Sequence, residues 1–305
     1  MSANLIESEP ARAFLDDQSS TLPDQLDQDD RVEWMVSVPY FLLHIIPFLW
    51  MGIFGATWSD LKLTIAVYLT GMFFVTAGYH RYFSHRSYKT GRVFQFILAL
   101  GAQLTLQKGV LWWAALHRHH HKYSDTDKDI HSPRRGFYWS HMGWILSKRC
   151  NEAPMELIGD FSAYPELRWL DRWHALPTIV LSLIIGLSLG PSALFVGYFL
   201  GLLAIWHGTY TINSLAHVIG RRRYETEDTS RNSAILAFLT LGEGWHNNHH
   251  YYQASARQGF FWWEVDVTYY VLKGLSWLGV VHGIRVPPAR VLAGRGRNRS
   301  RRNAQ

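Results

Sequence analysis

The histidines of this 305-residue chain are its most chemically distinctive residues, and ten of the sixteen fall in four short segments. The segments read HRYFSHR at 80–86, HRHHH at 117–121, NSLAH at 213–217 and HNNHH at 246–250. Imidazole nitrogen suits iron, copper, zinc and nickel, whereas magnesium and calcium prefer oxygen ligands. This clustering therefore predicts a transition-metal site rather than a set of scattered surface residues.

The spacing within the segments favours ligation. Residues three and four apart share one face of a helix, so the outer histidines of 117–121 can converge, as can those of 246–250. Asn213 and His217 are four apart and share a face for the same reason. His80 and His85 are five apart and would diverge by about 140° on a regular helix, so we expect that helix to end or bend between them. Nine histidines exceed the four ligands that one zinc ion takes, so we expect two ions.

The remaining histidines do not fit this pattern. His119 lies within the second segment but points off the face shared by its neighbours, which indicates a supporting or exposed residue. Four others stand alone in apolar or interfacial sequence, and we interpret them as packing residues. These are His44, His174, His207 and His282.

Long apolar runs determine the class of protein. The runs 35–58 and 63–79 carry no charge, and the run 175–206 is charge-free over a length too great for one crossing. A bilayer core needs roughly 20 apolar helical residues, and the third run divides at LGPS (189–192), where Gly and Pro favour a turn. The sequence therefore predicts an all-α integral membrane protein with four transmembrane helices arranged as two hairpins. The predicted spans are about 35–57, 61–80, 175–189 and 192–213.

The other segments complete one predicted membrane domain at 34–288. The segments at about 93–116 and 258–282 mix apolar and aromatic residues with polar ones, which is typical of helices at the membrane interface. Residues 1–33 are acidic and polar, without the pattern of a signal peptide, and predict a disordered leader. Residues 289–305 form a basic segment that we expect to be a disordered tail.

Charge predicts the orientation. The links within the two hairpins contain no Lys or Arg, whereas basic residues follow each hairpin, and positive segments stay on the cytoplasmic side. We therefore expect a cytosolic helical cap at a membrane such as a bacterial inner membrane, with lipid as a partner and no nucleic-acid partner. The single cysteine, Cys150, excludes disulfides and Cys-ligated iron–sulfur or zinc sites within the chain, so any electron supply must come from elsewhere.

The longer strings around the histidines resemble one known family. HRYFSHR, HRHHHKYSDTDKDIHSPRRGFYWSHMGW, NSLAH and GEGWHNNHH are similar to the histidine boxes of integral-membrane acyl-CoA desaturases of the stearoyl-CoA 9-desaturase type. The similarity covers about 35–288. It implies four transmembrane helices under a cytosolic cap that holds two non-haem irons. Matched position by position, it implies these ligands: His80, His85, His117, His120, His121, His217, His246, His249, His250 and, through water, Asn213.

The resemblance also implies a reaction and roles for further residues. Removing hydrogen from unactivated methylene carbons requires a redox metal and O₂. We expect a cis double bond, with Δ9 as the family's usual position. Acids that follow or precede the histidines could orient the ligand imidazoles, and two arginines could meet an acidic headgroup. The acids are Asp125, Asp129 and Glu243, and the arginines are Arg134 and Arg135.

Helix geometry suggests where the acyl chain ends. Met72 and Tyr68 lie near the stripe of the second span that carries His80, and so could close the far end of a substrate tunnel.

The chain differs from one part of the family at the second histidine box. Animal acyl-CoA desaturases carry an Arg-Asp pair before this box that helps to bind CoA, whereas this chain has Ala115 and Leu116. The acyl carrier therefore stays open between CoA, phospholipid and acyl carrier protein. The electron donor stays open between cytochrome b5, ferredoxin and rubredoxin types.

Two other functions share some of these features. A membrane diiron fatty acyl hydroxylase would use the same histidine boxes. A metal-binding or metal-transport membrane protein would place its polar ligands near the bilayer midplane within broken helices. Here the histidine boxes lie at or beyond the ends of the predicted spans, which counts against transport.

Overall fold

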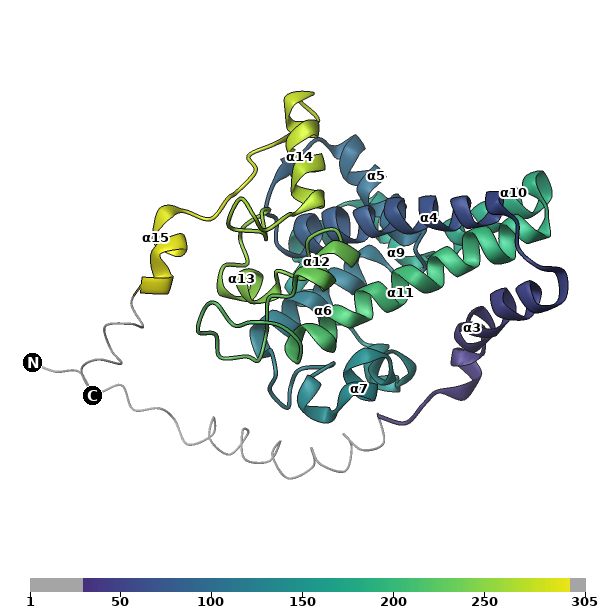
Figure 1. Ribbon diagram of the computed structural model, residues 1–305, viewed down its shortest axis with the longest axis horizontal. Coiled ribbons are helices and arrows are strands. Elements are labelled where there is room, and N and C mark those ends of the chain that lie inside the picture. The colour runs from purple at the N-terminus through teal and green to yellow at the C-terminus, as the bar shows by residue number, and fades with distance from the viewer. Residues whose placement is uncertain (1–29, 297–305) are drawn as a thin grey trace, which may run out of the picture.

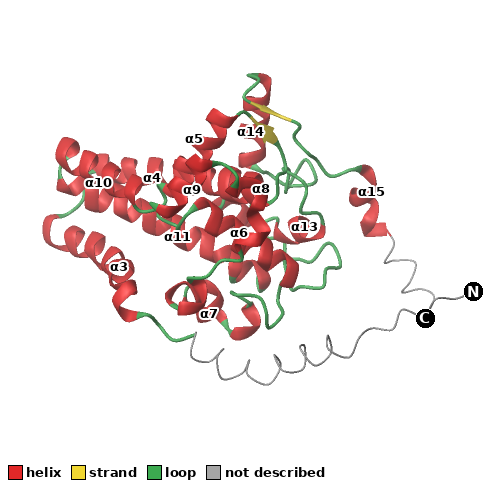
Figure 2. Cartoon of the chain, turned by 180° about the vertical axis from the view of Figure 1, so that it is seen from behind, coloured by secondary structure: helices red, strands yellow, loops and turns green. Residues whose placement is uncertain are grey.

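The computed structural model describes residues 30–296, in which helices form nearly all of the regular structure. The one ribbon is antiparallel and pairs β1 (Lys89–Thr90) with β2 (Val281–His282), as Figure 2 shows. The α-helices are α3 (Trp34–Phe54), α4 (Trp58–Phe73), α5 (Arg92–Gln103), α6 (Val110–Tyr123), α7 (Phe137–His141), α8 (Gly159–Ser162), α9 (Pro165–Arg172), α10 (Leu176–Leu189), α11 (Leu200–Asn213), α12 (Ala234–Leu239), α13 (His246–Tyr251), α14 (Val267–Trp277) and α15 (Ala289–Leu292).

Two π-helical segments extend the long helices, and short 3-10 helices occur mainly between the others. The π-helical segments are η1 (Phe74–Ser84), which continues α4, and η6 (Ala193–Phe199), which leads into α11. The 3-10 helices are η2 (Pro133–Arg135), η3 (Gly143–Leu146), η4 (Lys148–Cys150), η5 (Met155–Ile158), η7 (Leu215–His217) and η8 (Ala293–Gly296).

The two predicted hairpins are present and their links lie at the same end of the molecule (Figure 1). Helices α3 and α10 each end at a glycine with positive φ, Gly55 at 79° and Gly190 at 90°, a conformation that favours glycine. Helix α4 then begins with a capping box between Thr57 and Asp60. The Ser192 hydroxyl donates to the Asp60 carboxylate over 2.8 Å, which joins the two links directly.

Three helices are long and apolar enough to cross a membrane, namely 34–54, 58–84 and 193–217. Three of the four predicted spans are therefore confirmed as candidate spans. The remaining predicted span, the third along the chain, is α10, which has 14 residues and so rises about 21 Å against a bilayer core of about 30 Å. It reaches the length of a span only together with α9, from which it bends by 65°.

The predicted interfacial helix at 93–116 is wrong in its continuity, because the structure divides it into α5 and α6. Leu106 and Lys108 adopt positive φ in the turn between the two helices. The Gln103 side chain holds this turn by accepting from the Val110 amide and donating to the Leu170 carbonyl. The Asp171 carboxylate accepts from the first amides of α6, which caps that helix and fixes its position.

The second predicted interfacial helix, at 258–282, is shorter than expected. It begins only at Val267, because the Asp266 carboxylate caps α14 and also accepts from the amides of Gln258 and Gly259. The predicted disordered ends are also partly wrong. The Glu33 amide donates to the Leu146 carbonyl, and α15 and η8 occupy 289–296. The rest of the leader and the tail, at 1–29 and 297–305, lies outside the described residues.

The histidine segments are positioned by the core. Helix α11 packs along α4 and η1 packs against α5 and α6, so the ends of two long helices meet the cap helices at one place. Helix α3 lies to one side of this bundle (Figure 1), and only 11% of its most apolar 18-residue stretch is buried inside the protein. An apolar helix this exposed suits contact with lipid.

Candidate metal centre

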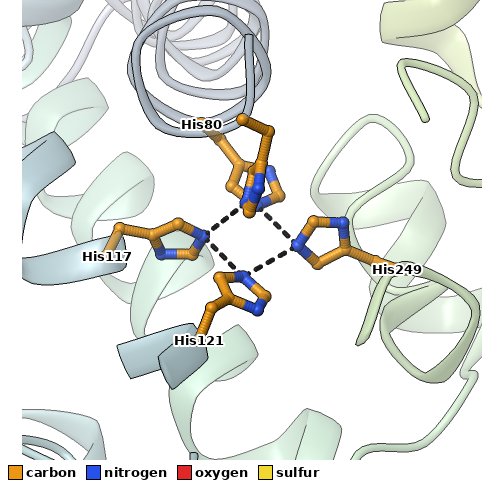
Figure 3. A group of neighbouring side chains, drawn as sticks. His80, His117, His121 and His249 are labelled. Atoms are coloured by element: carbon orange, nitrogen blue, oxygen red, sulfur yellow. Dashed lines mark hydrogen bonds between the residues drawn. The ribbon is translucent and has the colours of Figure 1, made fainter. Parts of the chain in front are cut away.

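Nine histidines converge in two groups, the first partly and the second fully buried, at the junction of the long helices and the cap. In each group, one nitrogen from every ring lies within 4.8 Å of those from all the other rings. The first histidine group is His80, His85, His117, His121 and His249, and Figure 3 shows most of its rings turned toward a common centre. The second histidine group is His120, His217, His246 and His250. The structure thus brings together all nine histidines named from the sequence.

The spacing of nitrogens in the first histidine group matches that of donors around one ion. Its Nε2 atoms form a series of short contacts: His80 to His249 at 3.1 Å, His249 to His121 at 3.0 Å, His121 to His117 at 2.9 Å and His117 to His85 at 3.0 Å. Donors at right angles and about 2.1 Å from one ion lie about 3.0 Å apart.

The second histidine group has the same spacing and lies beside the first. The Nε2 atoms of His217 and His246 are 3.1 Å apart. The rings of His121 and His250, which belong to different groups, have centroids 4.6 Å apart. The two groups are therefore adjacent sites rather than separate surface clusters.

The segments at 117–121 and 246–250 each contribute two histidines to one group and one histidine to the other. Helix α6 supplies His117 and His121, which are four apart, to the first group and His120 to the second. Helix α13 supplies the pair His246 and His250 to the second group and its remaining histidine to the first. The helical periodicity predicted that the histidines of each segment share a face. The division of each segment between two sites depends on the histidines of α6 and α13 meeting, as His121 and His249 do.

The π-helix η1 brings the side chains of His80 and His85 to the same side. The expectation that the helix ends or bends between them is confirmed, because η1 ends at Ser84, and the helix also widens into a π-helix before this end. The His85 amide donates to the His80 carbonyl at 3.2 Å, an i to i+5 bond typical of a π-helix. Residues five apart then face the same side, and both side chains enter the first group.

Asn213 and His217 reach the site by a different route from the predicted one. Helix α11 ends at Asn213, and His217 follows in the 3-10 turn η7, so the two do not share one regular helical face. His217 is buried in the second histidine group, and Asn213 lines the cavities beside the histidines. Its role as a ligand through water stays a prediction.

Carboxylates lie against the outer nitrogens of four of these imidazoles. The Nδ1 atom of His80 is 2.5 Å from Glu243, that of His120 is 3.0 Å from Asp129, and that of His217 is 3.2 Å from Asp125. All three acids had been named from the sequence. A carboxylate on Nδ1 accepts its N–H and leaves the Nε2 lone pair free to face an ion.

Sequence reasoning missed three neighbours of the centre. The Asp228 carboxylate lies 2.7 Å from Nδ1 of His250, and Gln258 donates to Glu243 and lies 3.2 Å from Nδ1 of His80. His131 lies beside His120, with ring centroids 4.3 Å apart. Nothing in the local sequence marks Asp228 or Gln258, whereas His131 belongs to the string DIHSPRRG that carried the family resemblance.

The electrostatics favour neutral imidazole at several of these histidines and an ionised carboxylate at Glu243. His120 is the exception, because burial alone would lower its pKa but Asp129 outweighs burial and raises it. Burial, reinforced by the neighbouring imidazoles, lowers the pKa values of His117, His121 and His249 well below the usual range. Burial alone would raise the pKa of Glu243, but His80 and Arg81 outweigh it and lower that pKa to about 2. Neutral imidazole is the form that binds a metal ion. The protonation states, the spacing of the Nε2 atoms and the supporting carboxylates therefore fit two cations held by histidine.

The histidines set apart as packing residues are not in either group. His44 and His207 instead form a chain with His141, through nitrogen contacts of 3.1 and 3.0 Å, that ends at the Ser214 hydroxyl. His119 is partly buried and contacts the Tyr123 ring at a tilt of 52°, outside both groups. His282 pairs through its backbone in β2, and His174 lines a cavity described next.

Two apolar cavities meet at the histidines. The larger, here called the acyl cavity, measures about 250 Å³ and lies between α3, α6, α11 and η3. The smaller, here called the inner cavity, measures about 40 Å³ and is bounded by Met72, His80 and Glu243 among others. Both are lined by Trp113, His117, Thr209 and Asn213, so the two cavities adjoin at the first histidine group. Of the two predicted tunnel-end residues, Met72 lines the inner cavity and Tyr68 does not. The end of the Met72 side chain and the Tyr68 hydroxyl both lie beside Gly208.

Polar cavities approach the histidines elsewhere. One of about 520 Å³ is lined by Lys122, Arg134 and Asp228 and reaches His121 and His250. Another, of about 430 Å³, is lined by Arg118 and reaches His85 and His121.

The two arginines named from the sequence lie differently. Arg134 is exposed at the first of these polar cavities. Arg135 pairs with Asp30 and lies over the ring of Trp139. Contact of either arginine with a substrate headgroup stays a prediction.

Comparison with known proteins agrees with this geometry. Residues 56–266 match the family model described as fatty acid desaturase. The chain belongs to the fatty acid desaturase family. It is 34% identical over 264 residues to an sn-2 palmitoyl-lipid 9-desaturase of Nostoc sp. (strain 36), which covers 85% of this chain and 92% of that protein. An sn-1 stearoyl-lipid 9-desaturase of Synechocystis sp. is 35% identical over 268 residues, covering 85% and 82%. An acyl-CoA 5-desaturase, AL21, of Anemone leveillei is 34% identical over 242 residues, covering 77% and 74%.

Membership in the desaturase family confirms the resemblance seen in the histidine strings. It makes the protein an oxidoreductase that acts on fatty acyl chains, in a family that uses non-haem iron. The long apolar helices agree with a membrane protein. The carrier of the acyl chain, the two-iron centre and the orientation in the membrane go beyond this result.

Proposed function

We propose that the protein is an O₂-dependent desaturase that introduces a cis double bond, at Δ9, into a saturated acyl chain carried on a membrane lipid. The observation that supports this most strongly is the position of the two histidine groups at the point where the acyl cavity and the inner cavity meet. An extended chain that occupies both cavities passes the first histidine group with carbon atoms on either side of it.

The proposed centre holds two non-haem iron ions, one in each histidine group, with Asn213 binding through water. Iron bound there would supply the O₂ chemistry that removes hydrogen from unactivated methylene groups, which no side-chain acid or base can do. Overall, two adjacent carbons each lose one hydrogen and a C=C bond forms. One O₂, two electrons and two protons are consumed, and two water molecules are released.

The residues of the chain hold and orient this centre. The carboxylates of Glu243, Asp125, Asp129 and Asp228 keep Nδ1 of their histidines protonated and direct Nε2 inward. The aromatic walls of the acyl cavity, including Trp113, exclude water from the reacting carbons. Met72 closes the inner cavity and thereby limits the length of chain beyond the double bond.

A lipid carrier fits this chain better than CoA. Ala115 and Leu116 stand where the animal enzymes have the Arg-Asp pair, and both are buried, so neither can contact CoA at the surface. The two cyanobacterial relatives are named for lipid-linked acyl chains. Acyl-CoA and acyl carrier protein are the alternatives that a substrate assay must separate.

The proposed topology places four spans as two hairpins, with α9 and α10 together forming the third. The histidine end then faces the cytoplasm, as the basic segments beyond each hairpin require. We assign the protein to the cytoplasmic membrane of a bacterium. The electron donor, of cytochrome b5, ferredoxin or rubredoxin type, would dock over the polar cavities that reach His85, His121 and His250.

Expression in a bacterium that cannot make unsaturated fatty acids tests the proposed function. We expect growth without added oleate, and gas chromatography with mass spectrometry should find cis-Δ9 products. His120→Ala should abolish growth, whereas His119→Ala, a change in the same segment but outside both groups, should keep it. Hydroxylated products would instead support the hydroxylase, and growth unaffected by His120→Ala would contradict the proposal.

A further inference from the structure

The wall of the acyl cavity carries one lysine, Lys108, for which the described part of the chain, residues 30–296, offers no counter-ion. Lys108 lines the cavity, and its ammonium lies 5.7 Å from the centre of the Trp112 ring. Within residues 30–296, no carboxylate lies within ion-pair distance of it; the nearby Asp171 is engaged by the amides that cap α6. Apart from histidines, Lys108 is the only ionisable base among the described residues that line this cavity.

The backbone fixes this lysine in place. Its φ is 67°, a conformation that a residue with a long side chain rarely adopts. The buried hydroxyl of Tyr79 donates to the Lys108 carbonyl over 2.8 Å and holds the turn. A strained backbone and a half-buried charge both cost stability, and such costs are common where a ligand is bound.

The cavity reaches the molecular surface beside residues that suit the interface of a membrane. Val36 lines the cavity and is 64% exposed, so the cavity opens beside the start of α3. Exposed tryptophans mark this level: Trp34 begins α3, and Trp173 precedes His174, which also lines the cavity. Tryptophan side chains favour the interface between headgroups and acyl chains.

The distance from the start of α6, next to Lys108, to His117 suits an acyl chain held by a lipid ester. Trp112, Trp113, Leu116 and His117 line the cavity in succession, so it runs along α6. From the start of α6 to His117 the helix rises about 11 Å. This length is comparable with the extended span from an acyl carbonyl carbon to the ninth carbon, so a carbonyl near Lys108 places the carbons of a Δ9 bond at the first histidine group.

We propose that Lys108 is a specificity residue that binds the phosphate of an anionic glycerophospholipid, with phosphatidylglycerol as the substrate class, while its acyl chain fills the acyl cavity. This inference rests on the proposed desaturase function. A single basic residue near a membrane surface strengthens binding of an anionic lipid about fivefold. The phosphate of a zwitterionic lipid carries the same charge, but the ammonium group beside it repels Lys108 and offsets the attraction. Lys108 therefore favours anionic over zwitterionic lipid, and it acts on binding rather than on the chemistry at the histidines.

Labelled lipid analysis tests the inference in cells. A bacterial host whose membrane contains phosphatidylglycerol and phosphatidylethanolamine is fed deuterated stearate and expresses the full chain. The two lipid classes are separated, and the deuterated Δ9 product is measured in each. Lys108→Asn removes the charge with a residue that tolerates positive φ, Lys108→Arg keeps the charge, and Lys148→Asn removes an exposed lysine that does not line the cavity.

We expect the ratio of labelled product in phosphatidylglycerol to that in phosphatidylethanolamine to fall about fivefold in Lys108→Asn. Lys108→Arg and Lys148→Asn should keep the wild-type ratio, and circular dichroism of purified Lys108→Asn should match wild type. An unchanged ratio in a folded Lys108→Asn protein would overturn this inference, while labelled Δ9 product would still support the desaturase activity. Desaturation of acyl-CoA before esterification would give the same unchanged ratio and would also overturn the proposed lipid carrier. Absence of labelled product with the wild-type chain would overturn the proposed function and this inference with it.

Discussion

Acyl-chain length is the most quantitative prediction that the cavities allow. Met72 is 1% exposed and lines the inner cavity together with His80 and Asn213. Met72→Ala removes the side chain beyond Cβ and enlarges a cavity of about 40 Å³. We expect the enzyme to accept a chain longer by about two methylene groups. Since one methylene in an apolar pocket changes discrimination about 10–200-fold, the ratio of C18 to C16 products should rise at least about tenfold.

Gly208 provides the opposite change at the same place. A Cβ at Gly208 would lie 2.6 Å from the Cε atom of Met72 and 3.2 Å from the Tyr68 hydroxyl. Gly208→Ala therefore forces the Met72 side chain to move and should narrow the inner cavity, which favours shorter chains. In the double variant, Gly208→Ala with Met72→Ala, the new methyl group meets space that the methionine has left. Its product profile should return toward that of the wild type.

The assay feeds C14, C16 and C18 saturated fatty acids to cells that express each variant and measures products by gas chromatography. Met72→Ala can cost about 2–5 kcal/mol of stability, so Met72→Leu, which keeps most of the volume at a cost below about 1.5 kcal/mol, is the matched control. If the single variants Met72→Ala and Gly208→Ala both leave the chain-length profile unchanged while the proteins stay folded, the inner cavity does not hold the end of the acyl chain.

Three further changes test other parts of the centre and its support. Asp228→Asn should weaken iron retention by about 10–100-fold, because the carboxylate orients His250. Glu227→Gln, on the same loop, should not weaken it. Equal iron content in the two variants after dialysis against a chelator would argue against this role of Asp228. Burial raises the pKa of the Cys150 thiol to about 11, so a maleimide should fail to label the folded protein at pH 8 and should label it after denaturation, and rapid labelling of the folded protein would be inconsistent with the structure. Arg81→Met should lower thermal stability strongly, by about 3–5 kcal/mol, because it leaves buried carboxylates without their partner; a calorimetric midpoint equal to that of the wild type would count against this ion pair.

Much of the site could be predicted from the sequence because histidine spacing and helix periodicity carry the necessary information. The nine histidines converge as predicted, and three of the four predicted spans form helices long enough to cross a membrane. The supporting acids Asp125, Asp129 and Glu243 could also be named, since each lies close in sequence to a histidine segment.

The features that escaped prediction depend on packing between distant segments. A π-helix cannot be distinguished from an α-helix by the apolar pattern of 74–84, yet it is what aligns His80 with His85. Asp228 has no local signal and meets His250 only because the loop at 218–233 folds over α13. The break at 104–109 depends on Gln103 finding partners in α6 and α9, whereas the isolated sequence favours one continuous helix.

The division of the histidines between two sites is the central claim, and anomalous X-ray scattering at the iron absorption edge from crystals of the purified protein tests it most directly. Two separate sites predict two iron peaks for each chain. One is enclosed by His80, His85, His117, His121 and His249, and the other by His120, His217, His246 and His250. A single peak, or iron bound away from these imidazoles, would contradict it.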